Sequence, residues 1–187
     1  MSETSDLTNH FLIAMPGLAD PNFSHTVTYI CEHNEKGAMG IVINRPSELT
    51  LGEVFDHMGI EASPRVDVEV PVYEGGPVEP EHGFVIHASV GAWDSSLKVT
   101  DDIAVTTSRD VLSAIAYGEG PKRYLFALGY AGWGAGQLED EIASNAWLSG
   151  PADSSILFES GPGQRWTAAA ALLGVDVNLL SSQIGHA

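Results

Sequence analysis

The chain has 187 residues, of which 44% are hydrophobic and 18% are charged. This length and composition predict a globular protein with one well-filled core and exclude a disordered chain. Eight lysines and arginines against 25 aspartates and glutamates give a formal net charge of −17, which opposes direct binding to nucleic acids and anionic membranes.

The amino terminus predicts a flexible tail over residues 1–9, followed by one domain over residues 10–187. Met1 to Asn9 is polar, without the basic and apolar regions of a secretory signal. A single cysteine, Cys31, excludes an internal disulfide. No apolar run reaches the roughly 18 to 20 residues that a membrane helix needs. We therefore expect a cytoplasmic protein with no membrane anchor.

The first part of the domain predicts an entry strand and a β-hairpin. The apolar strand His10 to Met15 is closed by Pro16. Thr26 to Glu32 alternates in the manner of a strand, the polar run His33 to Gly37 reads as a turn, and Ala38 to Ile43 returns as a second strand before Pro46. Three residues of the first hairpin strand are expected on the inward face: Val27, Tyr29 and Cys31.

The next stretch predicts a short helix, a loop and two strands. Thr50 to Glu53 spells a capping box before an apolar helical stripe that ends at Gly59. Glu61 to Val68 is acidic, contains proline and predicts a loop. The strands Val70 to Tyr73 and Gly83 to Ala88 are joined through two glycines and a proline.

The second half alternates short strands with helices. Tyr124 to Tyr130 is apolar on both faces, which favours a central strand covered on both sides. A glycine-rich turn is expected over Gly129 to Gly136. The other expected elements are strands at Leu97 to Val99, Ile103 to Thr106 and Ala146 to Leu148, helices at Ser108 to Tyr117, Gln137 to Ala143 and Trp166 to Leu173, and a short turn in the C-terminal tail.

This order of elements predicts an α/β (α+β) fold. Regular βαβ alternation is absent, so the core is expected to be a mixed β-sheet, open or barrel-like, with helices packed around it.

Cys31 and His33 stand two residues apart on the predicted strand, where they would share a face. That spacing suits half of a metal site or a nucleophilic Cys/His pair. Core packing of the cysteine is the favoured explanation, with a buried thiol of low reactivity. The carboxylates near Glu139 suggest acid/base catalysis or a solvated acidic face. The histidine spacings match no metal motif, and we expect neither a metal nor a cofactor.

Three polar segments at the ends of predicted strands or starts of helices are candidates for one anion-binding cleft. Backbone amides and arginines there would favour a carboxylate or phosphate. The alternatives are three separate structural corners, glycines that let Trp133 pack, and an Arg109 ion pair with Asp110 or Glu139. The candidate cleft residues are Asn44, Arg45, Ser108, Arg109, Gly132, Trp133 and Gly134.

The chain resembles the AlgH/YqgE family of bacterial proteins along nearly its whole length. The matching pieces are AMPxLxDPxF, YICEHNExGAMGIVINRP, VYEGGPV, GFVIHAS, TTSRDVL, ALGYAGWGAGQLExE, NAWL, RW and GHA. The resemblance implies a mixed α/β fold with a sheet core. Members are described as uncharacterised or, by genetic association with alginate synthesis, as regulators of transcription. This chain departs from the family pattern at His82, where relatives usually carry an arginine.

We therefore expect a cytoplasmic binding or regulatory protein whose effect on transcription is indirect. Its target would be an unknown protein partner, for example one with a basic surface, or a small anionic ligand, without direct contact to nucleic acid or membrane. The alternative is an enzyme such as a hydrolase that uses Cys31 and His33 or the carboxylates near Glu139.

Overall fold

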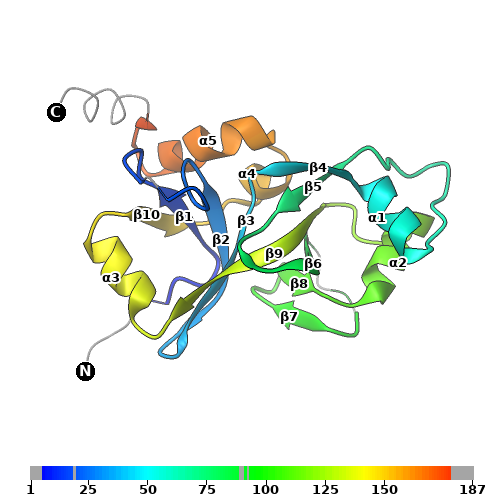
Figure 1. The fold of residues 1–187 in the computed structure, drawn as a ribbon, viewed down its shortest axis with the longest axis horizontal. Helices are drawn as coiled ribbons and strands as arrows, with labels where there is room; N and C mark the ends of the chain where they lie inside the picture. Colours follow the sequence, from blue (N-terminus) through cyan, green and yellow to red (C-terminus); the bar gives the residue numbers. More distant parts are fainter. Residues whose placement is uncertain (1–5, 19, 89–90, 92, 178–187) are drawn as a thin grey trace.

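The computed structural model describes residues 6–18, 20–88, 91 and 93–177, which form a mixed α/β fold around one strongly curled sheet (Figure 1). The sheet bends into a half-barrel, which confirms the predicted fold class. The strands are β1 (His10–Ala14), β2 (Val27–Asn34), β3 (Gly37–Val42), β4 (Pro46–Thr50), β5 (Pro71–Glu74), β6 (Val78–Ala88), β7 (Ser96–Lys98), β8 (Ile103–Thr106), β9 (Tyr124–Gly134) and β10 (Trp147–Pro151). The helices are α1 (Leu51–Met58), α2 (Arg109–Tyr117), α3 (Gln137–Ala143), α4 (Ser154–Phe158), the 3-10 turn η1 (Pro162–Gln164) and α5 (Arg165–Leu172).

Strand β9 joins the two halves of the sheet. Within the described residues the strand order is β10-β1-β2-β3-β9-β6-β8-β7, and β5 pairs with both β4 and β9. The pairing of β5 with β9 is parallel, whereas the neighbours along the main order pair antiparallel. The central position predicted for the strand that begins at Tyr124 is therefore confirmed.

The inner face of the curled sheet holds a hydrophobic core to which both halves contribute. Tyr29 of β2 and Ile86 of β6 belong to this buried cluster. Helices α4 and α5 add Leu157 and Ala170, so they cover the inner face. Each large apolar side chain buried there stabilises the fold by about 1.5–3 kcal/mol relative to exposure.

Arg165 anchors α5 to this core although it carries a charge. It is 2% exposed, and it donates from Nε to the Ile156 carbonyl at 3.1 Å and from Nη1 to the Ile43 carbonyl at 2.5 Å. Its guanidinium also lies 5.2 Å from the centre of the Tyr73 ring. Main-chain carbonyls and an aromatic face therefore replace water around the buried cation.

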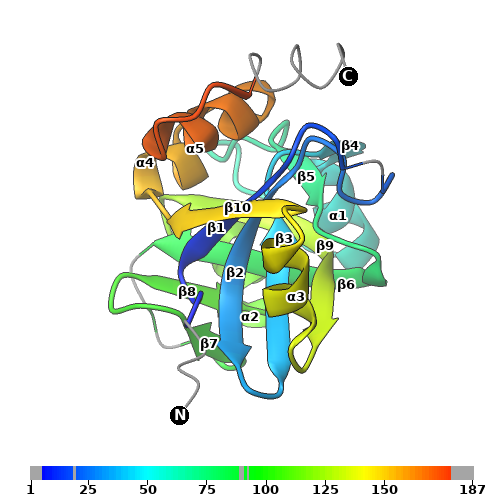
Figure 2. The same ribbon diagram turned by 90° about the vertical axis from the view of Figure 1, so that its left-hand side faces the viewer.

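The outer face of the sheet is covered in two separate places. Helices α1 and α2 bury Phe55 and Val111 with Phe126 of β9 in a second cluster. Helix α3 buries Leu138 with Leu12 and Trp133 in a third cluster. Figure 2 shows α3 in front of the sheet and α1 behind it, on opposite sides of the molecule in this view.

Strand β9 serves both outer clusters because its side-chain alternation shifts at Gly129. Phe126 and Leu128 pack with the α1–α2 cluster, whereas Ala131 and Trp133 belong to the α3 cluster, so the residues on the outer face change from even to odd numbers. The register between β9 and β6 is irregular at the same place. A one-residue shift of this kind moves every following side chain to the other face.

Gly129 permits this shift because its backbone is left-handed, with φ of 80°. A Cβ there would lie 2.4 Å from the Gly76 carbonyl oxygen, so any other residue would clash. The turn predicted over Gly129 to Gly136 is therefore wrong. The strand continues to Gly134, and the glycines allow a bulge and a close approach of backbones.

A bulge in β2 also overturns the predicted shared face of Cys31 and His33. The register of β2 against β3 shifts between Ile30 and Glu32, so Cys31 is the extra residue. Cys31 belongs to the inner core, whereas the His33 ring lies on the outer side beneath α3. The alternation that relates residues two apart does not continue across a bulge.

Most other predicted elements are confirmed with small shifts at their ends, but β6 begins at Val78, five residues before the predicted start at Gly83. Thr50 and Glu53 form the expected capping box of α1, and Gly59 ends it with φ of 68°. The sequence did not predict β4 or α4. Residues 6–9, predicted as part of the tail, pack on the sheet: Leu7 is 8% exposed, and the Tyr29 hydroxyl donates to Asn9 Oδ1 at 2.8 Å. Residues 1–5 and the predicted C-terminal turn after residue 177 lie outside the described residues.

Candidate functional site

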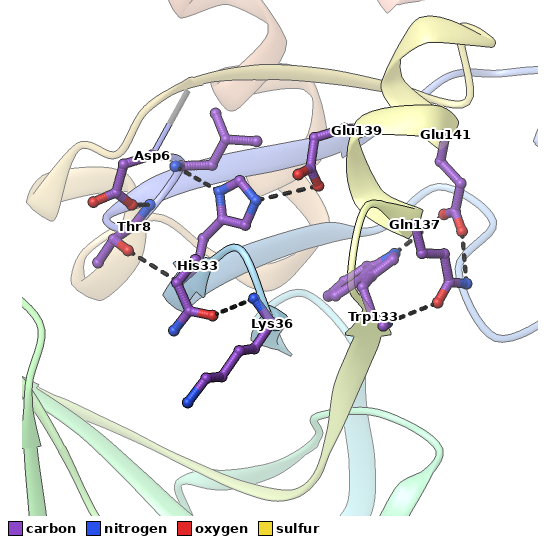
Figure 3. Close-up of polar contacts among 11 residues, drawn as sticks. Asp6, Thr8, His33, Lys36, Trp133, Gln137, Glu139 and Glu141 are labelled. Carbon is purple, nitrogen blue, oxygen red and sulfur yellow. Dashed lines mark hydrogen bonds and ion pairs between the residues drawn. The ribbon is translucent and has the colours of Figure 1, made fainter. Parts of the chain in front are cut away.

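His33 occupies the centre of a polar cluster beneath α3 (Figure 3). Its side chain is 1% exposed, and its Nδ1 accepts the Leu7 main-chain N–H at 2.9 Å. Its Nε2 lies 3.3 Å from Glu139 Oε1. Because Nδ1 acts as an acceptor, the neutral ring carries its proton on Nε2, and this N–H donates a hydrogen bond to the Glu139 carboxylate. The His33 N–H also donates to Thr8 Oγ1 at 3.1 Å, so this residue fastens residues 7 and 8 to the sheet.

Glu141 gathers the other donors of the same region. Its Oε1 accepts the indole N–H groups of Trp133 at 3.1 Å and Trp147 at 3.0 Å. Its Oε2 accepts the amide of Gln137 at 2.9 Å, and Gln137 Oε1 in turn accepts the Gly134 N–H at 2.9 Å (Figure 3). We call His33, Gln137, Glu139, Glu141 and the two indoles the α3 polar cluster.

The α3 polar cluster explains much of the glycine-rich segment as structure. Trp133 is 6% exposed and packs beneath α3, and the Gly134 amide is already bonded to Gln137. Gln137 and Glu141 stand four residues apart on a helix, a spacing that could have predicted their contact. Nothing in the sequence indicates that His33 meets Glu139, because 106 residues separate them.

Asn44 and Arg45 form a structural corner at the end of β3. Asn44 accepts the Val27 N–H and donates to the His25 carbonyl, each at 2.9 Å. The two terminal nitrogens of Arg45 donate to further main-chain carbonyls of residues 22 and 24, at 2.6 and 2.9 Å. These contacts tie the loop before β2 to the exit from β3.

Ser108 and Arg109 lie at the start of α2. Arg109 Nη2 donates to the Met58 carbonyl at 2.7 Å, and it forms neither of the ion pairs considered from the sequence. The Ser108 hydroxyl donates to the Asp110 carboxylate, and this bond, more than any other interaction, lowers the pKa of Asp110. The same carboxylate accepts main-chain N–H groups at 3.0 and 2.9 Å. Asp110 therefore already supplies a negative charge at this helix end.

Five of the seven candidate cleft residues border three hollows, and Asn44 and Gly134 line none of the three. Arg45 lines one, Gly132 and Trp133 line a second, and Ser108 and Arg109 line a third. The first and third adjoin, because both are bordered by Leu49, Pro80 and Leu128. The second shares no lining residue with either. The structure thus brings the Arg45 and Arg109 segments to neighbouring hollows and places the glycine-rich segment elsewhere.

The hollow at Arg109, which we call the α1–α2 groove, has a volume of about 680 Å³. Its apolar lining comes from α1, α2 and the outer face of β6 and β9. Hydroxyl groups and the guanidinium come from the residues that lead into α2. The lining consists of Leu49, Val54, His57, Met58, Pro80, Glu81, Gly83, Val85, Thr106, Thr107, Ser108, Arg109, Leu112, Phe126 and Leu128.

Other features of the described residues give no sign of a metal centre or a membrane segment. Across residues 6–18, 20–88, 91 and 93–177, no group of three or more histidine, cysteine, aspartate or glutamate side chains is arranged to hold a metal ion. No helix in those ranges is long and apolar enough to cross a membrane. His82, the departure from the family pattern, is exposed, and its Nδ1 lies 4.0 Å from Glu79 Oε2.

Comparison with known proteins gives consistent matches over the full length. A UPF0301 protein of Thioalkalivibrio sulfidiphilus is 63% identical over 187 residues, covering 100% of both chains. The solution structure of the AlgH protein from Pseudomonas aeruginosa is 53% identical, with a TM-score of 0.80 over 100% of this chain and 99% of that one. A crystal structure of a Corynebacterium diphtheriae protein shares the fold, with a TM-score of 0.76 at 21% identity over 97% of this chain and 94% of that one. The family profile described as AlgH-like, a domain of unknown function, matches residues 11–178. The chain belongs to the AlgH-like family.

Proposed function

We propose that this protein is a cytoplasmic regulatory protein that binds a small ligand in the α1–α2 groove. The observation that supports the proposal is the groove itself. Its volume of about 680 Å³ falls within the roughly 300–1,000 Å³ typical of small-molecule sites. Apolar walls with a few polar groups at one end are also typical of such sites.

Any effect on transcription is then indirect. A net charge of −17 opposes the phosphate backbone of DNA. Four of the eight basic residues, Arg45, Arg109, Arg123 and Arg165, already donate to main-chain carbonyls of the chain itself. The regulatory signal would pass through the ligand or through a protein partner. Salt-dependent fluorescence anisotropy with duplex DNA tests this point, and binding at micromolar protein or tighter would contradict it.

A hydrolase built on Cys31 and His33 has less support. Cys31 is 1% exposed, and burial raises the pKa of its thiol, which opposes formation of the nucleophilic thiolate. The His33 ring is engaged by the Leu7 N–H and by Glu139. We expect the native thiol to react slowly with a thiol reagent and the unfolded thiol to react promptly. Prompt stoichiometric labelling of the native protein would favour the hydrolase instead.

Groove binding can be tested with two probes of equal length, 1-octanol and octanoate. Titration of the ¹⁵N-labelled protein should shift amide resonances around Val85, Leu112 and Phe126. Val54 is half-buried on α1 and lines the groove, so Val54→Trp should fill it and abolish the shifts. Tyr117→Trp is the matched control, because Tyr117 is 58% exposed and lies outside the groove lining. Failure of both probes to shift groove amides would refute the proposed function.

A further inference from the structure

Building on the proposed binding function, we propose that the ligand of the α1–α2 groove is an amphipathic monoanion. Its apolar body would lie on the outer face of β6 and β9, and its carboxylate would bind the guanidinium of Arg109. This assigns a chemical class to the site and a specific role to one side chain.

The charge of Arg109 has no partner of opposite sign among the residues that the structure describes. Among the described residues, its only hydrogen bond runs to the Met58 carbonyl, and no carboxylate lies within 4.0 Å of its nitrogens. Among the described lysines and arginines only Lys98 forms an ion pair, with Asp101, so Arg109 is distinguished by its place on the border of the groove. A guanidinium has five N–H donors in a planar fork that matches a carboxylate.

The contact with Met58 fixes where that charge lies. The bond from Nη2 to the Met58 carbonyl, at 2.7 Å, holds the guanidinium against the C-terminal end of α1. The remaining N–H groups stay available on an exposed side chain that borders the groove. A ligand carboxylate would therefore meet donors that are already oriented, with little further loss of side-chain entropy.

The main-chain N–H groups at the start of α2 do not supply the anion site. Asp110 already accepts the Ser108 hydroxyl and the Val111 N–H there, and it also accepts the N–H of Asp94. A second anion at those amides would meet the Asp110 carboxylate and be repelled. The guanidinium is consequently the group that selects charge.

The walls of the groove require an apolar body on the same ligand. Val85, Phe126 and Leu112 are 1%, 3% and 6% exposed and form a nonpolar floor, and α1 contributes Val54 and Met58. An apolar ligand body placed there would leave water itself and would cover the half-buried Val54 and Met58, a gain that a small inorganic anion cannot make. Glu81 also lines the groove, and this carboxylate disfavours a ligand with a second negative charge.

The test compares octanoate with 1-octanol on the native protein and on Arg109→Gln. We expect octanoate to bind the native protein more tightly, and Arg109→Gln to weaken octanoate about tenfold while leaving 1-octanol unchanged. Octanoate affinity should also fall with added salt, whereas 1-octanol affinity should not. Arg109→Lys, which keeps the charge, should retain part of the preference.

Arg65→Gln is the matched control, because Arg65 is exposed, lies outside the groove and carries the same charge. Equal affinity for both probes, with Arg109→Gln without effect, would overturn the ligand class while leaving groove binding intact. Absence of binding by either probe would instead overturn the proposed function as well. Equal losses from Arg65→Gln and Arg109→Gln would show a general charge effect and would also refute the role assigned to Arg109.

Discussion

The α3 polar cluster and the α1–α2 groove both lie on the outer face of the sheet, yet they use polar groups in opposite ways. In the α3 polar cluster, Glu141 accepts three side-chain donors of the same chain. In the groove, Arg109 has one main-chain acceptor and no ion pair among the described residues. The first region uses its polar groups within the chain, whereas the second has guanidinium donors that no described residue uses.

The density of family motifs along the sequence does not reveal this difference between a structural cluster and a candidate binding site. The glycine-rich segment near Trp133 looks like a ligand loop, but its polar groups hold the fold together. The start of α2 is less conspicuous in the sequence, but it combines a cation with an apolar groove. Substitutions in the α3 polar cluster should therefore change stability, whereas substitutions in the α1–α2 groove should change ligand binding.

The largest expected effect on stability is that of Glu141→Ala. The change leaves the indole N–H groups of Trp133 and Trp147 without their acceptor, so we expect a loss of about 3 kcal/mol in the free energy of unfolding. Urea unfolding followed by tryptophan fluorescence measures it. Asp140→Ala is the control on the same helix and should change stability by less than about 0.5 kcal/mol. Equal effects of the two variants would mean that the α3 polar cluster is not a stabilising network.

His33→Leu should have the next largest effect. It removes the acceptor of the Leu7 N–H and the donor to Glu139, and we expect a loss of about 1–2 kcal/mol. Hydrogen exchange at the Leu7 amide should accelerate more than exchange in the inner core. The exposed His82→Ala serves as control. Unchanged exchange at Leu7 would contradict the fastening role assigned to His33.

Arg109→Gln should alter stability little, in contrast to Glu141→Ala. The side chain is exposed and loses one hydrogen bond, so we expect a change below about 1 kcal/mol. The same urea titration measures it, and Arg65→Gln provides the baseline for an exposed arginine. A loss as large as that of Glu141→Ala would show that Arg109 is a structural residue and would remove the contrast between the regions.

Acid should have the smallest effects, through Asp6, which precedes the Leu7 N–H bound by His33, and through Asp110, which follows Arg109. Hydrogen bonds from Thr8 lower the pKa of Asp6 below 3.8, and the Ser108 bond does the same for Asp110. A lowered folded-state pKa gives stability that is present above 3.8 and lost as the pH falls through the folded value. Asp6→Asn and Asp110→Asn should each reduce the loss of stability that accompanies the fall in pH. Thermal unfolding between neutral pH and pH 3 checks this, and unaltered slopes would contradict it.

Local patterns in the sequence determined much of the secondary structure. The alternation of β2, the capping box at Thr50 and the left-handed glycine after α1 depend on neighbouring residues, so they are readable from the chain. The burial of Cys31 followed from the same alternation with Val27 and Tyr29. Family membership followed from motifs spread over the whole length.

Only the tertiary structure decided which of these residues meet. A bulge at Cys31 and a left-handed backbone at Gly129 each invert the side-chain alternation, and both depend on the partner strand as well as on the local sequence. His33 reaches Glu139 across 106 positions because β2 and α3 share the outer face of the curled sheet. The α1–α2 groove likewise exists because the same sheet supports two helices whose contacts are far apart in sequence, with Arg109 bonded to Met58 across 51 positions. Such groups meet only when the chain packs in three dimensions, and local sequence patterns do not predict which distant residues will be in contact.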